Sequence, residues 1–140
     1  MKFIKYIVIL FLLFPLTVNA YTKAVVDITS MSITVLKDAL DKGYLTSELL
    51  VTLYLERIDA YNSKFNAIRE INESALEEAR KLDKEREEGN VRSILHGIPI
   101  VVKTNIDVEG LATTAGAKAL SDNYPNEDAK VIQKLKDAGA

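Results

Sequence analysis

The sequence predicts an α/β fold in which several N-terminal helices precede the first strands of an incomplete sheet. Three observations support this class. Apolar residues recur at helical spacing in four segments of the 140-residue chain. Residues 94–102 form an almost continuously apolar, β-branched run, which is typical of a strand covered on both faces. The last helical segment ends at Gly139, where a βα repeat commonly continues into another strand, so we expect the rest of the sheet to lie beyond Ala140.

The first 20 residues have the composition of a secretory signal peptide. Lys2 and Lys5 precede an apolar core at residues 6–16, and residues 18–20, Val-Asn-Ala, form a small-x-small cleavage pattern. The apolar core is shorter than the roughly 20 residues of a membrane-spanning helix, so cleavage after Ala20 is favoured over a retained anchor. We therefore expect residues 21–140 to form the mature domain, secreted or periplasmic, with no stable membrane association after cleavage.

Two helices are expected after a weak, β-prone lead-in at Ala24–Ile28. Residues 29–32 supply capping side chains for the first helix, and Gly43 is suited to end it. Its apolar face comprises Ile33, Leu36, Ala39 and Leu40. Thr46 or Ser47 caps the second helix. The apolar stripe of that helix comprises Leu49, Leu50, Leu53, Tyr54, Ile58 and Tyr61.

Two further helices are expected nearer the C-terminus. Ser74 and Glu77 have the spacing of a capping box at the start of the third helix. Residues 77–88 are mostly charged with both signs mixed, which favours a solvated helix face over a docking surface. The fourth helix is expected to begin near Asn126, with Gly139 as its C-terminal cap.

The most convincing strand is Pro99–Lys103. Proline cannot donate a ladder hydrogen bond, so the strand begins at Pro99 or has a free edge there. Lys103 then stands at the carboxyl end of a buried strand, where open α/β sheets place their ligands. A lysine in such a place can act as the base for a serine nucleophile. Alternatively, it is a structural lysine whose ammonium group extends into water.

The composition excludes several kinds of site. The absence of cysteine excludes disulfides, a cysteine nucleophile and a thiolate metal site. A net charge of −2 provides no basic field, so we expect no nucleic-acid partner. His96 is the single histidine, which makes a histidine-based metal cluster or a Ser-His-Asp triad hard to build. We therefore expect no cofactor and no metal.

Two alternative sites have ordinary structural explanations. His96 precedes the strand, and a local hydrogen bond is favoured for it over catalysis. Asp107 and Glu109 could form a carboxylate pair, but acids in a loop beside Gly110 are more often solvated turn residues.

Residues 95–103, Leu-His-Gly-Ile-Pro-Ile-Val-Val-Lys, resemble the N-terminal catalytic segment of the amidase signature family. The likeness continues through residues 105–107, Gly110 and residues 113–116, Thr-Thr-Ala-Gly, and ends at residues 135–140, Leu-Lys-Asp-Ala-Gly-Ala. Segments near residues 45–49, 57–58 and 66–67 look like the opening helices of that family. The resemblance covers about residues 29–140, and its specific part is the G-I-P-x-x-x-K block.

The resemblance implies a mixed-sheet domain of which residues 21–140 would be the N-terminal portion. It also implies hydrolysis of carboxamide C–N bonds by a Ser–cis-Ser–Lys triad on a small-molecule or peptide amide. Lys103 occupies the position of the family's base and proton relay. The two serines come later in the family, in a Gly/Ser-rich stretch that this sequence lacks. We therefore expect one catalytic residue, Lys103, and an inactive chain in isolation.

Two residues depart from the family pattern. Thr104 follows the lysine where aspartate is usual, and Ala117 follows Gly116 where serine is common. The missing serines and Thr104 leave open an alternative, a noncatalytic secreted interaction module derived from a truncated amidase. A third hypothesis is the glutaminase-type subunit of aminoacyl-tRNA transamidation. That reaction is cytosolic, and the signal peptide argues against it.

Overall fold

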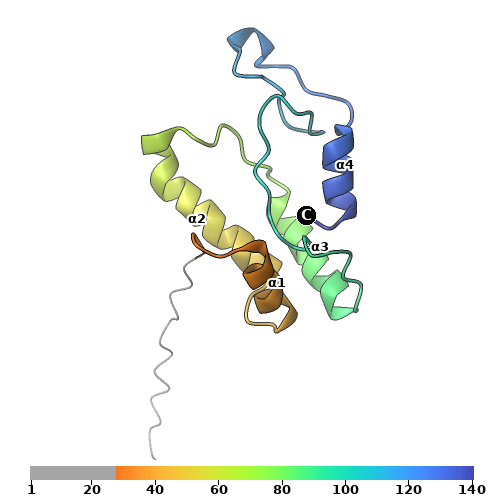
Figure 1. Ribbon diagram of the computed structural model, residues 1–140. Coiled ribbons are helices and arrows are strands. Elements are labelled where there is room, and N and C mark those ends of the chain that lie inside the picture. Colours follow the sequence, from red (N-terminus) through yellow and green to blue (C-terminus); the bar gives the residue numbers. More distant parts are fainter. Residues whose placement is uncertain (1–27) are drawn as a thin grey trace, which may run out of the picture.

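The computed structural model describes residues 28–140, which contain four α-helices and one short 3-10 helix (Figure 1). The elements are α1 (Ile33–Asp41), α2 (Ser47–Phe65), α3 (Ala75–Glu87), η1 (Lys118–Leu120) and α4 (Lys130–Asp137). The expected signal peptide lies outside the described residues, as does all of the weak strand except Ile28, which lies in a turn. None of the described helices is long and apolar enough to span a membrane.

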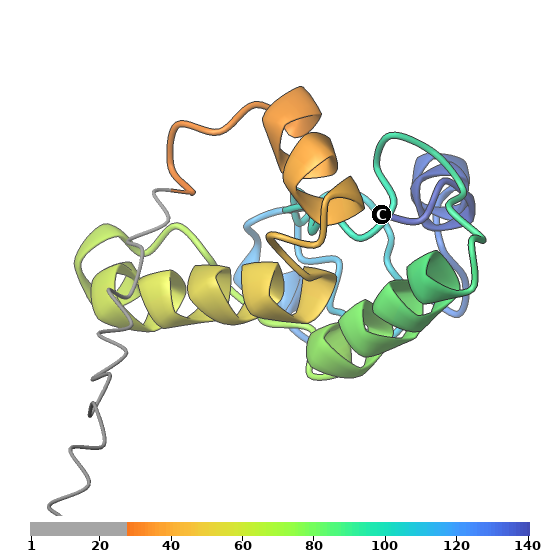
Figure 2. The same cartoon turned by 90° about the horizontal axis from the view of Figure 1, so that it is seen from below.

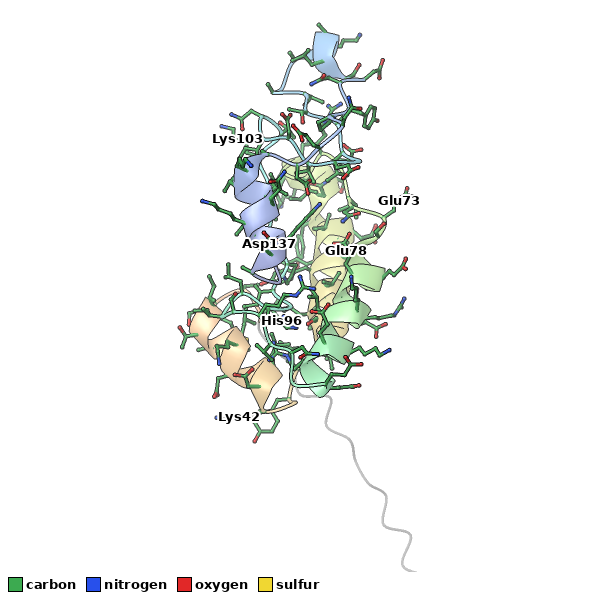
Figure 3. All side chains as sticks on the ribbon, turned by 90° about the vertical axis from the view of Figure 1, so that its right-hand side faces the viewer. Lys42, Glu73, Glu78, His96, Lys103 and Asp137 are labelled. Atoms are coloured by element: carbon green, nitrogen blue, oxygen red, sulfur yellow. The ribbon has the colours of Figure 1, made fainter. Side chains whose placement is uncertain are left out.

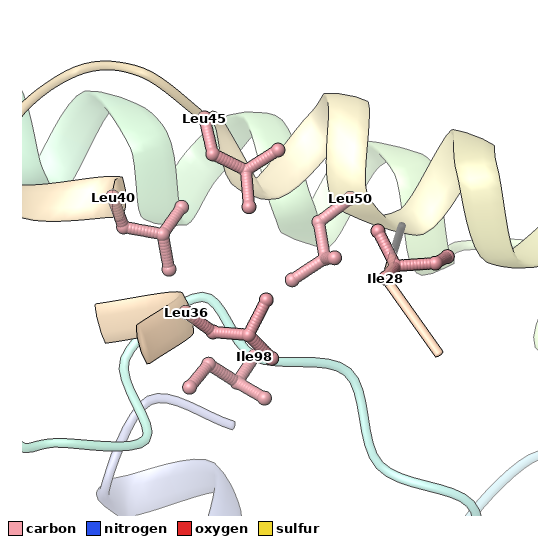
Figure 4. Close-up of a cluster of buried hydrophobic side chains, with 6 residues drawn as sticks. All are labelled: Ile28, Leu36, Leu40, Leu45, Leu50 and Ile98. Atoms are coloured by element: carbon pink, nitrogen blue, oxygen red, sulfur yellow. The ribbon is translucent and has the colours of Figure 1, made fainter. Parts of the chain in front are cut away.

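A small apolar core lies between α1, α2 and the segment that contains Ile98. Helices α2 and α3 pack against each other, and α1 lies across from the first turns of α2 (Figure 2). The buried side chains of this cluster are Ile28, Leu36, Leu40, Leu45, Leu50 and Ile98 (Figure 4). Burial of each such aliphatic side chain contributes about 2 kcal/mol. Because Ile98 belongs to the cluster, the segment that leads to Lys103 starts from this core.

Side chains cap the first two helices. The Ser32 hydroxyl accepts a hydrogen bond from the Val35 amide at 3.3 Å, and the Thr46 hydroxyl accepts one from the Leu49 amide at 3.0 Å. These bonds satisfy amides that have no partner within the helix. The predicted caps of both helices are therefore confirmed, and Thr46 is the cap of α2.

The predicted capping box of α3 is wrong. Ser74 has helical backbone angles (φ −82°, ψ −4°), and its side chain makes no capping bond. A residue in that conformation cannot direct its hydroxyl back to the first free amides as an extended cap residue does. Asn72 makes the side-chain bonds at this helix start instead. Its side-chain oxygen accepts from the Ser74 backbone amide at 3.0 Å, and its side-chain amide donates to the Glu78 carboxylate at 3.2 Å.

The start of α4 differs from the prediction at Asn126. The helix begins at Lys130 with Ala129 in the cap position, while Gly139 follows its last turn with φ +87°. The Ala129 amide donates to the Asp107 carbonyl at 3.0 Å, and Asp128 accepts from the Glu109 amide at 2.8 Å. These bonds hold the residues before the helix against a distant loop, so they are not free to form an earlier turn.

The predicted buried strand Pro99–Lys103 is not formed within residues 28–140, which contain no strand. The segment is irregular, and Val101 is 76% exposed. No amide from Ile100 to Lys103 donates to a backbone carbonyl of the described residues. An apolar segment with four free amides has the properties of a strand whose neighbouring strands are not among these residues.

Candidate active-site segment

Lys103 lies where the apolar segment ends and a turn begins. The Lys103 carbonyl accepts from the Ile106 amide at 3.0 Å, and the Thr104 carbonyl accepts from the Ala115 amide at 2.8 Å. The side chain of Lys103 is exposed, and its ammonium group has no hydrogen bond or ion pair with the described residues. The burial expected from the sequence is therefore not present here, and the lysine is available for another group.

The Thr-Thr-Ala-Gly motif supports the backbone beside Lys103. Ala115 (φ 47°) and Gly116 (φ 78°) both have left-handed backbone conformations, which make a tight turn. Thr114 is 1% exposed and anchors that turn in the interior. Because the Ala115 amide binds the residue directly after Lys103, this motif fixes the position of the lysine backbone.

His96 makes local hydrogen bonds, as predicted. It is 1% exposed, its Nε2 lies 2.9 Å from the Leu82 carbonyl, and its Nδ1 accepts from the Arg92 amide at 3.3 Å. This pattern assigns the imidazole hydrogen to Nε2. Figure 3 shows His96 and Lys103 at well-separated levels of the molecule, so the described residues do not bring the two together.

Two glycines of the family-like motifs make close contacts. The Gly97 amide donates to the Gly139 carbonyl at 2.7 Å. A Cβ atom on Gly97 would lie 2.0 Å from the Ser47 hydroxyl oxygen, and Gly97 also has φ +80°. Only glycine fits such a position. The Leu-His-Gly and Ala-Gly-Ala motifs therefore meet, and they join α2, α4 and the start of the Lys103 segment.

Arg86 and Asp83 were missed because they belong to the charged run that we expected to be a solvated face. The Arg86 guanidinium donates to the His96 carbonyl at 2.8 Å and pairs with Asp41. The Asp83 carboxylate accepts from the amides of Ser47 at 2.7 Å and Glu48 at 2.9 Å. The run is exposed for the most part, yet these two side chains face inward and tie α3 to its neighbours.

The acidic residues of the loop after Lys103 and of the segment before α4 take part in contacts that hold these two segments together. Asp107 and Glu109 are exposed, and their backbone groups bind the segment before α4. Burial acts to raise the pKa of Asp128, but the bonds from Lys136 (2.6 Å) and the Glu109 amide (2.8 Å) outweigh it and lower that pKa below its ordinary 3.8. Residues 28–140 contain no group of three histidine or acidic side chains able to hold a metal ion.

Known proteins share this segment. The sequence profile of the family described as Amidase matches residues 49–140. The chain is 45% identical over 103 residues to a subunit of the glutamyl-tRNA(Gln) amidotransferase of Salinibacter ruber, a match that covers 73% of this chain and 20% of that protein. It is 36% identical over 103 residues to the indoleacetamide hydrolase of Bradyrhizobium diazoefficiens, with 73% and 20% of the two chains covered.

Solved structures agree with the sequence relatives. The native peptide amidase of Stenotrophomonas maltophilia matches with a TM-score of 0.77 and 38% identity, over 80% of this chain and 23% of that one. Its fold is α/β, as expected from the sequence here, although the described residues contribute helices alone. The chain spans about a fifth of the length of the relatives it matches. The chain belongs to the amidase family.

Proposed function

We propose that residues 28–140 form the N-terminal part of an amidase catalytic domain and supply Lys103 as its base. The observation that carries this proposal is the setting of Lys103. Its ammonium group is exposed and unpaired among the described residues, while its backbone is held by the turn at Ala115. The lysine backbone is therefore fixed by the Thr-Thr-Ala-Gly turn while its side chain stays accessible to a further group.

The proposed reaction is hydrolysis of a carboxamide C–N bond. A serine hydroxyl attacks the amide carbon, and its proton passes through a second serine to the side chain of Lys103, which accepts the proton as the neutral amine. Collapse of the tetrahedral intermediate breaks the C–N bond, and the proton returns to the leaving ammonia or amine. Water then hydrolyses the acyl-enzyme to release a carboxylic acid. The substrate is a small-molecule or peptide amide, in line with the peptide amidase among the relatives.

The free segment before Lys103 supports a sheet built from further strands. Ile100 (43% exposed) and Val101 (76% exposed) present apolar side chains to solvent, beside four amides that donate to no backbone carbonyl of the described residues. Pairing with neighbouring strands would satisfy the amides and cover the side chains. We propose that these strands, and both serines, belong to the four fifths of the relatives' length that this chain does not match.

The test replaces the matching part of the S. maltophilia peptide amidase with this chain and measures ammonia release from a peptide amide. We expect the chimera to be active and the isolated chain to be inactive. Lys103→Ala in the chimera should lower kcat by about 10³-fold, since it removes the general base. Lys118→Ala, another exposed lysine, is the matched control. Unchanged kcat in a folded Lys103→Ala chimera contradicts the proposal, as does turnover by the isolated chain.

A second candidate, a noncatalytic interaction module, is favoured by the core of α1, α2 and Ile98, which closes without a sheet. Export of the protein is common to both candidates and rests on residues 1–20. The chimera described above separates them. Ammonia release by the chimera supports the amidase part, whereas a folded chimera without activity supports the module.

A further inference from the structure

A shallow surface cavity of about 390 Å³, open to solvent over most of its extent, lies apart from the features used above. Its lining residues are Arg69, Glu70, Ala112, Ser121 and Tyr124. They come from the segment after α2, the loop after Lys103 and the segment after η1. Lys103 is not among them, so this cavity is a separate candidate site.

Hydrogen bonds hold the walls of the cavity together. The Ala112 amide donates to Glu70 Oε2 at 3.1 Å, which joins the loop after Lys103 to the segment after α2. The Thr113 amide donates to the Asn123 carbonyl at 2.9 Å, and the Asn123 side chain donates to the Thr113 carbonyl at 3.0 Å. These two bonds join the loop after Lys103 to the segment that carries Tyr124. These bonds connect the three segments that line the cavity.

The polar groups of the cavity carry both signs of charge. The Arg69 guanidinium has no ion pair or hydrogen bond with the described residues, although Glu70 is its neighbour. Glu70 uses Oε2 for the Ala112 amide and leaves Oε1 free. Tyr124 is 56% exposed and adds an aromatic ring with a hydroxyl, and Ser121 adds a second hydroxyl. Adjacent opposite charges that form no ion pair with each other or with the other described residues are suited to a ligand that carries both charges.

We propose that this cavity binds the zwitterion of a free α-amino acid. Arg69 would donate two parallel hydrogen bonds to the α-carboxylate, the geometry in which guanidinium groups bind carboxylates. Glu70 Oε1 would accept from the α-ammonium group, which can also lie over the ring of Tyr124. A phosphate dianion fits less well because the Glu70 carboxylate would repel it. The site is independent of the proposed amidase reaction.

The test titrates the ¹⁵N-labelled chain with L-leucine and monitors the amide NMR signals of residues 69, 70, 112, 121 and 124. We expect saturable shifts with a Kd on the order of millimolar, as the contacts of so small a ligand allow. N-acetyl-L-leucine lacks the ammonium and L-leucinamide lacks the carboxylate, and each should bind at least about tenfold more weakly.

Variants assign the contacts. Arg69→Gln and Glu70→Gln should each weaken L-leucine binding about tenfold. In Glu70→Gln the new side chain can still accept from the Ala112 amide, so the wall contact is kept. Arg57→Gln and Glu73→Gln are matched exposed controls and should bind normally. Lys103→Ala should also bind normally, so failure here is distinct from failure of the amidase proposal. Absence of saturable shifts, or equal binding of N-acetyl-L-leucine, overturns the inference.

Discussion

Gly139 lies so close to His96 that a Cβ atom on the glycine would be 2.7 Å from the imidazole Nδ1 and 3.0 Å from the His96 Cα. The carbonyl of the same glycine accepts from the amide of Gly97 at 2.7 Å. Two motifs that are far apart in the sequence therefore form one contact. That contact sets where the segment leading to Lys103 leaves the core.

Gly139→Ala should lower the free energy of unfolding by about 3 kcal/mol, because a left-handed backbone strains alanine and the Cβ overlaps a packed histidine. Urea denaturation measures the change. Gly89→Ala is the matched control, since Gly89 has φ +82° but an added Cβ atom there would meet nothing within 4 Å, and it should cost only about 1 kcal/mol. Equal costs for the two variants would show that the contact with His96 has no energetic role.

Ser47→Ala should leave stability unchanged or raise it by up to about 1 kcal/mol. The Ser47 hydroxyl oxygen is buried and has no hydrogen-bond partner in the described part of the chain, so its removal sacrifices no bond. Thermal unfolding provides the measurement. A loss above about 1 kcal/mol would indicate that the hydroxyl has a partner in solution.

Gly97→Ala should destabilise the wild-type chain by about 3 kcal/mol, because its Cβ would overlap the Ser47 hydroxyl. In the Ser47→Ala chain, the same change should cost about 1 kcal/mol less, since the nearest atom is gone. A double-mutant cycle by urea denaturation measures this coupling. Strict additivity of the two changes would contradict the predicted overlap.

The caps of α1 and α2, which local sequence determines, were predicted, whereas the parts of the fold set by distant contacts were not. Ser32 and Thr46 cap their helices through amides three residues away, so the pattern around them is sufficient. The start of α4 depends on the carbonyl of Asp107, far away in the sequence, and no local signal reports it. The strand predicted at Pro99–Lys103 is not formed, because this segment has no backbone hydrogen-bond partners among the described residues and its apolar composition alone cannot produce a sheet.

In the candidate site, too, local contacts were predicted from the sequence and contacts between distant segments were not. The role of His96 followed from its place before a strand, and the structure confirms local bonding. The roles of Asp83 and Arg86 could not be predicted, because a mixed charged run looks alike whether a given side chain faces water or a neighbouring helix. Three-dimensional packing decides that question. The position of Lys103 relative to the expected serines stays a prediction.

The stability of the chain should fall in acid in part through Asp128. Because its folded pKa lies below the ordinary 3.8, the ionised carboxylate stabilises the fold above that pH. This contribution is lost as the pH falls below 3.8 through the lowered folded pKa. Asp128→Asn should give a flatter dependence of unfolding free energy on pH between about pH 5 and 2. Parallel curves of unfolding free energy against pH for the variant and the wild type would contradict this contribution of Asp128.

Asp83 should contribute more to stability than its place in a charged run indicates. Its two carboxylate oxygens accept from the first two amides of α2, at 2.7 and 2.9 Å, so a residue of α3 supplies a charged cap to another helix. Asp83→Ala leaves two partly buried amides without partners and should cost about 3 kcal/mol.

Asp83→Asn keeps one acceptor oxygen and should cost less, about 1 to 2 kcal/mol. Glu87→Ala is the matched control, because Glu87 lies on the same helix but makes no bond to α2 among the described residues. Hydrogen exchange at the amides of Ser47 and Glu48 gives a direct local measurement. Both should exchange faster in Asp83→Ala than in Glu87→Ala, because the carboxylate protects these two amides by accepting from them. If Glu87→Ala loses as much stability as Asp83→Ala, the general charge of α3 matters and the specific cap does not.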